Sequence, residues 1–269
     1  MTIGFIGCGN MAQPIIRSLI NTEMYQCSDV FVYDTDSEKL QNFCNTTKAI
    51  MCNSENEIVQ NAETVFICIK PQGFADLLPK IAESVNQNQP FVVSIAAGKE
   101  IAFIEGFFDD KCRVGRVFPN LNASVCASAS AYCVNRNCGE QERDLLGKIV
   151  SAFGTARYFS EELLAQFGVL GGCSPAYTFM YVNSLAQAAE KNGIDRQTAL
   201  ETAIQAVLGS ALYMKESGID PEQLIDRVCS KGGTTIEGVN VLRNNDLPGI
   251  VCNAYEASLR RDKELSGQK

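Results

Sequence analysis

The chain has 269 residues, of which 46% are hydrophobic and 20% charged, and its formal net charge is −8. This length can hold a substantial core and predicts two domains. The negative charge argues against a nucleic-acid surface, which needs clustered Lys and Arg, and against an anionic membrane. No apolar run approaches the roughly 18–20 residues that span a bilayer, and the first residues do not resemble a signal peptide, so we expect a cytosolic protein.

The twelve cysteines are scattered along the chain. No Cys-x-x-Cys pair occurs and the chain has no histidine, and both observations argue against a zinc or iron–sulfur site. Several cysteines, such as Cys68 and Cys133, sit in apolar runs, where a thiol packs as a small hydrophobic group. We therefore expect no bound metal, and packed thiols rather than disulfides or a redox site.

Strand-like and helix-like segments alternate over residues 1–159. The predicted strands are 3–7, 30–34, 49–51, 64–70, 90–97, 112–118, 130–134 and 156–159. Helices are expected over 10–22, from 37, after the capping pattern at 54–57, over 73–86 and over 140–152. Continuous apolar runs are typical of strands buried on both faces of a parallel sheet. The alternation predicts an α/β, Rossmann-like doubly wound domain over residues 1–159.

From residue 160 to residue 269 the pattern predicts an all-helical domain. Gly193 is expected to end one helix before Asp195 caps the next. In the same way, Gly218 is expected to end a helix, with Asp220 as the N-cap and Pro221 as the first residue of the helix that follows. A helix expected from Ala176 to Lys191 has a long apolar face, which is more typical of a core or a subunit interface than of a cofactor site. The residues on this face are Tyr177, Met180, Tyr181, Leu185 and Ala188.

The N-terminal segment "GFIGCGNMA" has the spacing of a dinucleotide-binding loop. Gly7 allows a tight turn, Gly9 lets the backbone approach a pyrophosphate, and Ala12 is small enough for the helix to lie against the sheet. The helix N-terminus then offers N–H groups and a positive dipole end to the phosphates. A second strand ends in Asp34, where a carboxylate can accept both ribose hydroxyls.

The residues after that second strand bear on the choice of cofactor. The segment Asp34-Thr35-Asp36 places two carboxylates where a 2′-phosphate would need cations. Lys39, one turn into the next helix, is the nearest cation. We therefore expect NADH to be preferred over NADPH.

The absence of histidine favours an imine substrate. A ketone reductase needs a positioned acid, whereas a protonated imine is already an electrophile, so that the enzyme mainly aligns the partners and excludes water. Tyr177 or a water molecule is an alternative acid. In the second domain, "SKGGTT" (230–235) is predicted to open a helix whose N–H groups and hydroxyls suit a carboxylate. The alternative is an ordinary N-cap by Thr234 or Thr235.

Six motifs in this order resemble the pyrroline-5-carboxylate reductases, the last enzymes of proline synthesis, over essentially the whole chain. They are "GFIGCGNMA", "IKPQ" (69–72), "SIAAG" (94–98), "RVFPN" (116–120), "GGCSPAY" (171–177) and "SKGGTT". In that family a Rossmann domain precedes helices that intertwine into a dimer, and many members form higher assemblies. The resemblance implies reduction of Δ1-pyrroline-5-carboxylate to L-proline by NAD(P)H, in a homodimer or larger homo-oligomer.

The resemblance also implies the site residues. Cofactor contacts are expected at Gly7, Gly9, Asn10, Met11, Asp34, Thr35, Lys70, Pro71, Ala96, Ala97 and Asn120. Substrate contacts are expected at Glu161, Ser230, Gly233, Thr234 and Thr235. Backbone N–H groups near Thr234 would hold the substrate carboxylate. The Thr235 hydroxyl would face the ring nitrogen as orienter or proton donor, which makes Thr235 and Glu161 the candidate catalytic residues.

The chain departs from the family pattern in two segments. Gly171, Gly172, Cys173 and Ser174 replace Ser-Gly-Ser-Gly, and Leu121-Asn122 replaces Thr-Pro. Both lie near the expected meeting point of nicotinamide and substrate, so the substrate range can differ. Two alternatives therefore stay open: a reductase of another cyclic imino acid, for example with a six-membered ring, and a non-catalytic dinucleotide-binding regulatory protein.

Overall fold

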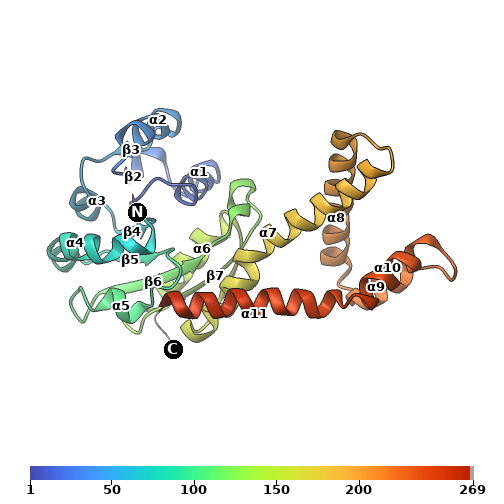
Figure 1. The fold of residues 1–269 in the computed structure, drawn as a ribbon. Coiled ribbons are helices and arrows are strands. Elements are labelled where there is room, and N and C mark those ends of the chain that lie inside the picture. Colours follow the sequence, from blue (N-terminus) through green and yellow to red (C-terminus); the bar gives the residue numbers. More distant parts are fainter. Residues whose placement is uncertain (267–269) are drawn as a thin grey trace. The chain divides into compact units, whose positions relative to one another are not determined.

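A computed structural model describes the backbone of residues 1–266 and the side chains of residues 1–264. The chain divides into two compact units (Figure 1). The first comprises Met1–Cys173 and the segment that starts at Ser258, and the second is Ser174–Ala257. The domain boundary expected at 159/160 falls after the last strand, whereas the division by contacts falls inside the helix that follows. The boundary at 159/160 stays a prediction.

The first unit contains an eight-stranded sheet in the order β3-β2-β1-β4-β5-β6-β7-β8. Its strands are β1 (Ile3–Ile6), β2 (Val30–Tyr33), β3 (Ile50–Met51), β4 (Thr64–Ile67), β5 (Phe91–Ser94), β6 (Arg113–Phe118), β7 (Ser128–Val134) and β8 (Gly154–Tyr158). Strands β1 to β6 are parallel, and Ile3 of the central β1 pairs with Val30 on one side and Thr64 on the other. The predicted Rossmann-like, doubly wound domain is confirmed.

The last two strands reverse direction. β7 runs antiparallel to β6, with Gly115 opposite Val134, and β8 runs parallel to β7. The β6–β7 connection contains only the short 3₁₀ helix η3 (Leu121–Val125), and a parallel crossover needs about a dozen residues or more. The longer helix α6 (Glu140–Ser151) makes the crossover from β7 to β8 possible.

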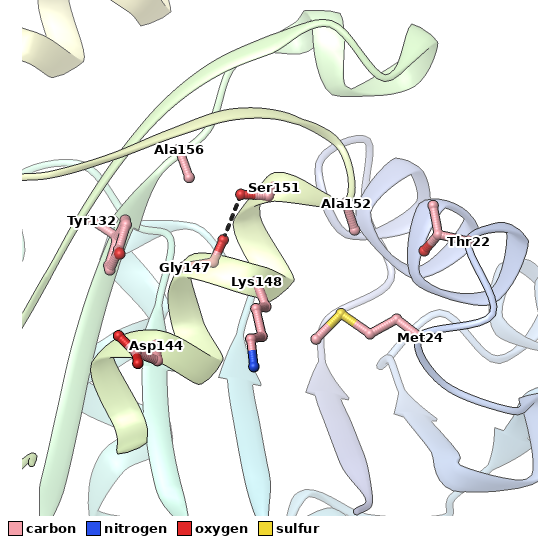
Figure 2. Close-up of a pocket in the computed structure, with 9 residues that line it drawn as sticks. All are labelled: Thr22, Met24, Tyr132, Asp144, Gly147, Lys148, Ser151, Ala152 and Ala156. Carbon is pink, nitrogen blue, oxygen red and sulfur yellow. Dashed lines mark hydrogen bonds between the residues drawn. The ribbon is translucent and has the colours of Figure 1, made fainter. Parts of the chain in front are cut away.

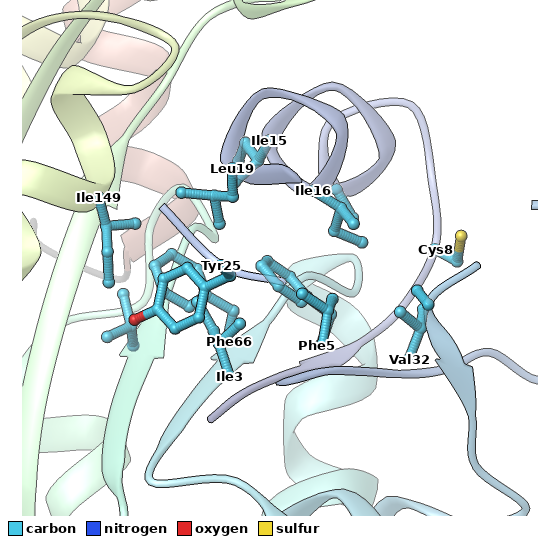
Figure 3. Close-up of a cluster of buried hydrophobic side chains, with 14 of the residues drawn as sticks. Ile3, Phe5, Cys8, Ile15, Ile16, Leu19, Tyr25, Val32, Phe66 and Ile149 are labelled. Carbon is cyan, nitrogen blue, oxygen red and sulfur yellow. The ribbon is translucent and has the colours of Figure 1, made fainter. Parts of the chain in front are cut away.

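Helices cover both faces of the sheet because the strand side chains alternate between two apolar clusters. α1 (Ala12–Asn21), α2 (Ser37–Thr47) and α6 lie on one face. In Figure 3, Ile15, Ile16 and Leu19 of α1 face Phe5 and Phe66 of the sheet. The other face carries α3 (Glu55–Asn61), α4 (Phe74–Asn88), α5 (Ile101–Glu105) and the first turn of α7 (Glu161–Lys191).

The second unit is helical throughout. It contains the rest of α7, α8 (Arg196–Ser217), α9 (Pro221–Val228), α10 (Thr234–Asn244) and the first part of α11 (Leu247–Ser266). The predicted punctuation is confirmed: Asp195 accepts a hydrogen bond from the Thr198 N–H (3.0 Å), and Asp220 accepts one from the Glu222 N–H (2.9 Å). Gly218 ends α8 with a left-handed φ of +62°.

Helix α7 corrects one prediction. The segment "GGCSP" was expected at the head of a helix starting at Ala176, but the helix starts at Glu161 and continues through Pro175. Proline removes the N–H that would bond to the carbonyl of Gly171, four residues earlier. The side chain of Asn120 donates to that carbonyl at 2.9 Å, and the proline therefore does not end the helix.

No helix within residues 1–266 is long and apolar enough to cross a membrane. In the same range, no group of three or more metal-binding side chains is arranged to hold an ion. None of the twelve cysteines, all of which lie in the described part of the chain, forms a disulfide.

Candidate active site

The residues predicted to contact the cofactor follow the ends of five parallel strands. Gly7 follows β1, Asp34 follows β2, Lys70 comes shortly after β4, Ala96 follows β5 and Asn120 follows β6. Because the carboxyl ends of parallel strands meet at one edge, these residues lie along the same edge of the sheet. The strand order reverses direction between β1 and β4, and such a switch point is where nucleotides bind in open α/β sheets.

Gly7 sits in a position that only glycine fits. Its φ is +102°, and its N–H donates to the Tyr33 carbonyl oxygen at 2.8 Å. A Cβ atom at this position would lie 2.7 Å from the carbonyl oxygen of Cys68, which follows β4. The turn after β1 is therefore fixed by its two neighbouring strands.

Gly9, in contrast, faces open space. A Cβ atom there would meet no atom within 4 Å, so the glycine is not required by the packing of the chain itself. Helix α1 follows, with Met11 as its N-cap, no side-chain hydrogen bond to the cap and no acidic residue in its first turn. An uncapped helix start beside an open glycine fits a pyrophosphate, which Gly9, Asn10 and Met11 would hold through backbone N–H groups.

The carboxylate of Asp34 binds the chain itself. Its Oδ2 accepts from the Cys8 N–H at 2.6 Å, and its Oδ1 accepts from the Asp36 N–H at 2.9 Å and lies 3.0 Å from Lys39 Nζ. Burial alone would raise the pKa of Asp34, but the two N–H groups and the ammonium hold it below its ordinary value. Asp34 thus anchors the loop between β1 and α1 to the end of β2.

A cavity of about 260 Å³ opens beside Gly7 and Asp34. It is lined by Ile6, Gly7, Tyr33, Asp34, Thr35, Glu55, Ile69, Gly73, Asp76, Leu77 and Lys80. Three of these side chains are carboxylates and one is an ammonium, so the cavity is predominantly acidic. Its position at the ends of β1 and β2 is the one expected for the adenosine ribose of a dinucleotide.

Four further predicted contacts follow β4 and β5 on this edge. Lys70 is exposed and precedes the 3₁₀ turn η2 (Pro71–Gly73), whose first residue is Pro71. After β5, the Ala96 N–H donates to the Ser94 hydroxyl at 3.1 Å, and Ala97 is exposed. Lys70 and Ala97 are available to a ligand that extends along the strand ends from the β1–α1 loop, whereas Ala96 is buried.

Asn120 is buried and points toward α7. Its Oδ1 accepts from the Asn122 N–H at 3.0 Å, and its Nδ2 donates to the Gly171 carbonyl oxygen at 2.9 Å. Its own N–H donates to the Ser128 hydroxyl at 3.1 Å. The side-chain amide therefore has partners on both its oxygen and its nitrogen within the chain.

Glu161, the first residue of α7, is held by one of its two carboxylate oxygens. Its Oε1 pairs with Arg116 Nη1 and accepts from the Ile101 N–H at 2.8 Å. No hydrogen bond to Oε2 occurs within the described residues, and the side chain borders a cavity of about 370 Å³. Arg116 is 5% exposed, and sequence reasoning did not single it out. An arginine inside the apolar strand "RVGRVF" was the available signal.

The four other predicted substrate residues come together in the second unit. Gly232 has a φ of +73°, and the Gly233 N–H donates to the Ser230 carbonyl oxygen at 3.0 Å. A Cβ atom on Gly233 would overlap the hydroxyl of Ser230, an exposed side chain that can rotate away. The left-handed φ of Gly232 is therefore what favours glycine in this turn. Gly233 is the N-cap of α10, and the alternative in which Thr234 or Thr235 is the cap is wrong. Both threonines and Ser230 are exposed.

A groove on the first unit contains none of the predicted site residues. It measures about 590 Å³ and lies between α6, β7, β8 and the end of α1 (Figure 2). Its Ser151 hydroxyl donates to the Gly147 carbonyl oxygen at 2.8 Å rather than into the groove. The predicted site residues lie at the strand ends and in the turn before α10 instead.

Comparison with known proteins agrees with this geometry. Residues 161–265 match the family model for pyrroline-5-carboxylate reductase dimerisation, and residues 2–98 match the model for NADP oxidoreductase, coenzyme F420-dependent. The chain is 33% identical over 264 residues to the pyrroline-5-carboxylate reductase of Escherichia coli K12, covering 98% of each chain.

Two solved structures have the same fold. A pyrroline-5-carboxylate reductase from Coxiella burnetii is 30% identical with a TM-score of 0.90, and 98% of each chain is covered. The Plasmodium falciparum pyrroline carboxylate reductase, solved with NADP bound, is 23% identical with a TM-score of 0.88, over 99% of this chain and 98% of that one. The resemblance found in the motifs is confirmed, and the chain belongs to the pyrroline-5-carboxylate reductase family of NAD(P)-dependent oxidoreductases.

Proposed function

We propose that this chain reduces Δ1-pyrroline-5-carboxylate to L-proline, with NAD(P)H as the reductant. The observation that carries the proposal is the full-length 33% identity to the pyrroline-5-carboxylate reductase of Escherichia coli K12. The open Gly9 and the uncapped start of α1 support it independently, since they fit a pyrophosphate. When bound, NAD(P)H supplies the hydride.

The turn before α10 is proposed to hold the substrate. N–H groups at Thr234 and its neighbours receive the carboxylate, because the N-terminus of a helix favours an anion. Ser230 and Gly233 shape this turn through the hydrogen bond between their backbones. The hydroxyl of Thr235 faces the ring nitrogen and orients it or donates a proton.

Glu161 is proposed to contribute its second oxygen. Arg116 and the Ile101 N–H both engage Oε1, which fixes the carboxylate and leaves Oε2 for the substrate. A carboxylate held in this way needs no reorganisation to orient a cationic imine.

Thr235→Val tests the role of the hydroxyl. We expect kcat/KM for the imine to fall by about 10²-fold, the scale of a lost orienting or acid group. Thr234→Val is the matched control, because it keeps the backbone N–H and should stay within a few-fold of wild type.

Initial rates with pyrroline-5-carboxylate and with its six-membered analogue test which imine the wild-type chain reduces. A clear preference for the analogue, or no turnover of either, would favour one of the two alternatives instead.

NADH is the proposed preferred reductant. Asp34, Glu55 and Asp76 line the ribose-side cavity against the single cation Lys80, and like charges disfavour a 2′-phosphate there. Lys39 is paired with Asp34 and offsets part of this charge. A higher kcat/KM with NADPH than with NADH would contradict the preference.

We also propose that the chain works as a homodimer, or a larger assembly built on dimers, in the cytoplasm. The dimerisation model matches residues 161–265, and the second unit exposes many large apolar side chains. Twelve unbridged thiols suit a reducing compartment.

A further inference from the structure

Pro175 and Asn120, which are 55 positions apart in the sequence, act on the same carbonyl group. An α-helix bonds each carbonyl oxygen to the N–H four residues later, and Pro175 has no N–H to give to Gly171. Gly171 is buried, so its carbonyl oxygen has no access to bulk water as a substitute. Asn120 Nδ2 donates to it at 2.9 Å.

The orientation of the Asn120 amide is fixed by a second bond. Its Oδ1 accepts from the Asn122 N–H, a backbone group that can only donate, and its Nδ2 must therefore be the atom that faces Gly171. Asn120 is 5% exposed. A buried amide that is satisfied on both atoms is a poor candidate for a side-chain ligand of the cofactor.

Two glycines bring α7 close enough for this contact. A Cβ atom on Gly171 would lie 3.0 Å from the Ala129 carbonyl oxygen, and one on Gly168 would lie 2.6 Å from the ring of Phe118. The helix backbone thus lies directly against the ends of β6 and β7, within reach of a short side chain. At the start of the helix, Glu161 is held by Arg116 of β6.

We propose that Asn120 is a positioning residue, which replaces the N–H missing at Pro175 and fixes the Gly171–Pro175 turn of α7 at the end of β6. This role rests on the proposed function only for its effect on catalysis. The two segments in which the chain departs from the family pattern, 121–122 and 171–174, lie at the two ends of this hydrogen bond. We infer that they adjust the same contact.

A double-mutant cycle in the full-length chain tests the proposal. Asn120→Ala should lower the midpoint of thermal unfolding by about 3–8 °C, because a buried carbonyl loses its donor. In Pro175→Ala the helix regains its N–H, and adding Asn120→Ala to that variant should lower the midpoint by less than half as much. Ser84→Ala, which removes the hydroxyl that donates to Asn56 between α4 and α3, is the control and should be additive with Pro175→Ala.

Kinetics separate positioning from ligand binding. We expect Asn120→Ala to raise the KM for NADH and lower kcat. In the double variant Asn120→Ala with Pro175→Ala, the KM and kcat should lie within about threefold of the values for Pro175→Ala alone. The proposal would be overturned if Asn120→Ala lowered the unfolding midpoint and raised the KM for NADH by the same amount in wild type and in Pro175→Ala. Asn120 would then be a direct ligand.

Asn120→Asp provides a second test should Asn120→Ala fail to fold. It keeps the acceptor for Asn122 but turns an oxygen toward Gly171, and an unfolding midpoint equal to that of wild type would contradict the proposal. A wild-type chain that reduces no pyrroline-5-carboxylate would refute the proposed function, while the unfolding cycle would still test Asn120.

Discussion

Gly7 and Gly9 are two residues apart, and the structure gives them different reasons to be glycine. Gly7 has a left-handed φ and a neighbouring carbonyl where its Cβ would be. Gly9 has neither constraint, since its Cβ would point into open space. Folding therefore requires the first glycine, and the approach of a ligand is our proposed reason for the second.

Replacing each of the two glycines should separate stability from binding. Gly7→Ala should lower the free energy of unfolding by about 1–3 kcal/mol, because alanine is strained at φ +102°. Gly9→Val should unfold like wild type yet raise the Kd for NADH by about 100-fold, as the pyrophosphate loses its backbone contacts. Denaturant titration and fluorescence titration with NADH measure the two effects. Unchanged NADH affinity in Gly9→Val would contradict a pyrophosphate site at Gly9.

Asp34 links the loop between β1 and α1 to the second strand, and its contribution to stability should depend on pH. Its pKa is lower in the folded chain than in the unfolded chain, where an aspartate has a pKa of about 3.9. The unfolded chain therefore takes up the proton more readily, and this stabilisation is present above about pH 4 and lost as the pH falls through the native pKa. The unfolding free-energy difference between wild type and Asp34→Asn should shrink from pH 7 to pH 3. A difference that stays constant over this range would contradict it.

At the scale of the element, α7 combines glycines of two kinds. Gly168 and Gly171 pack against β6 and β7, whereas a Cβ atom on Gly172 would meet nothing within 4 Å. Glycine is unfavourable inside a helix, so its use at the first two positions is explained by close packing. Gly172 is exposed and has no such explanation in packing.

Alanine at Gly168 and at Gly172 should have different effects on stability. Gly168→Ala should destabilise the unliganded chain by about 1–3 kcal/mol, because its methyl group would overlap the ring of Phe118. Gly172→Ala should leave stability unchanged or raise it by up to about 1 kcal/mol through helix propensity. Denaturant unfolding curves measure the change in stability of both variants. Equal changes at the two positions would refute the packing argument.

At the scale of the molecule, the second unit buries little within one chain. Its small buried cluster consists of Val182, Ala186, Ala199 and Ala203. On the apolar face expected for the helix that ends at Lys191, Met180 is 72% exposed, and Tyr181 and Leu185 are also exposed. Of the two interpretations left open for this face, a subunit interface therefore has the stronger support.

A charge placed on this exposed apolar surface should weaken the proposed dimer. Leu208 of α8 is 49% exposed, and Leu208→Lys should raise the dimer dissociation constant by about 100-fold, since burying an unpaired ammonium is costly. Gln41→Lys on α2 adds the same charge outside the second unit and should have no effect. Light scattering across a dilution series measures both. A monomeric wild type, or an unaffected Leu208→Lys, would contradict the interface.

Local signals predicted most of the elements correctly. The strands on either side of Asp34 and Ala96, and the caps at Asp195 and Asp220, depend on nearby residues and were placed within a few positions. The start of α7 was missed because a proline normally limits a helix, and the donor that compensates for Pro175 comes from Asn120. The Arg116–Glu161 pair was also missed, because its two residues are 45 positions apart in the sequence.

The sequence by itself determined the alternation of strands and helices, the glycine loop, the helical second half and the family, because each of these is encoded in short-range patterns. Only the tertiary structure decided which glycines are required by packing, which atoms of Asp34 and Glu161 are already engaged, and how Pro175 is tolerated. These depend on distances between residues far apart in the chain, and such distances exist only once strands and helices have packed together.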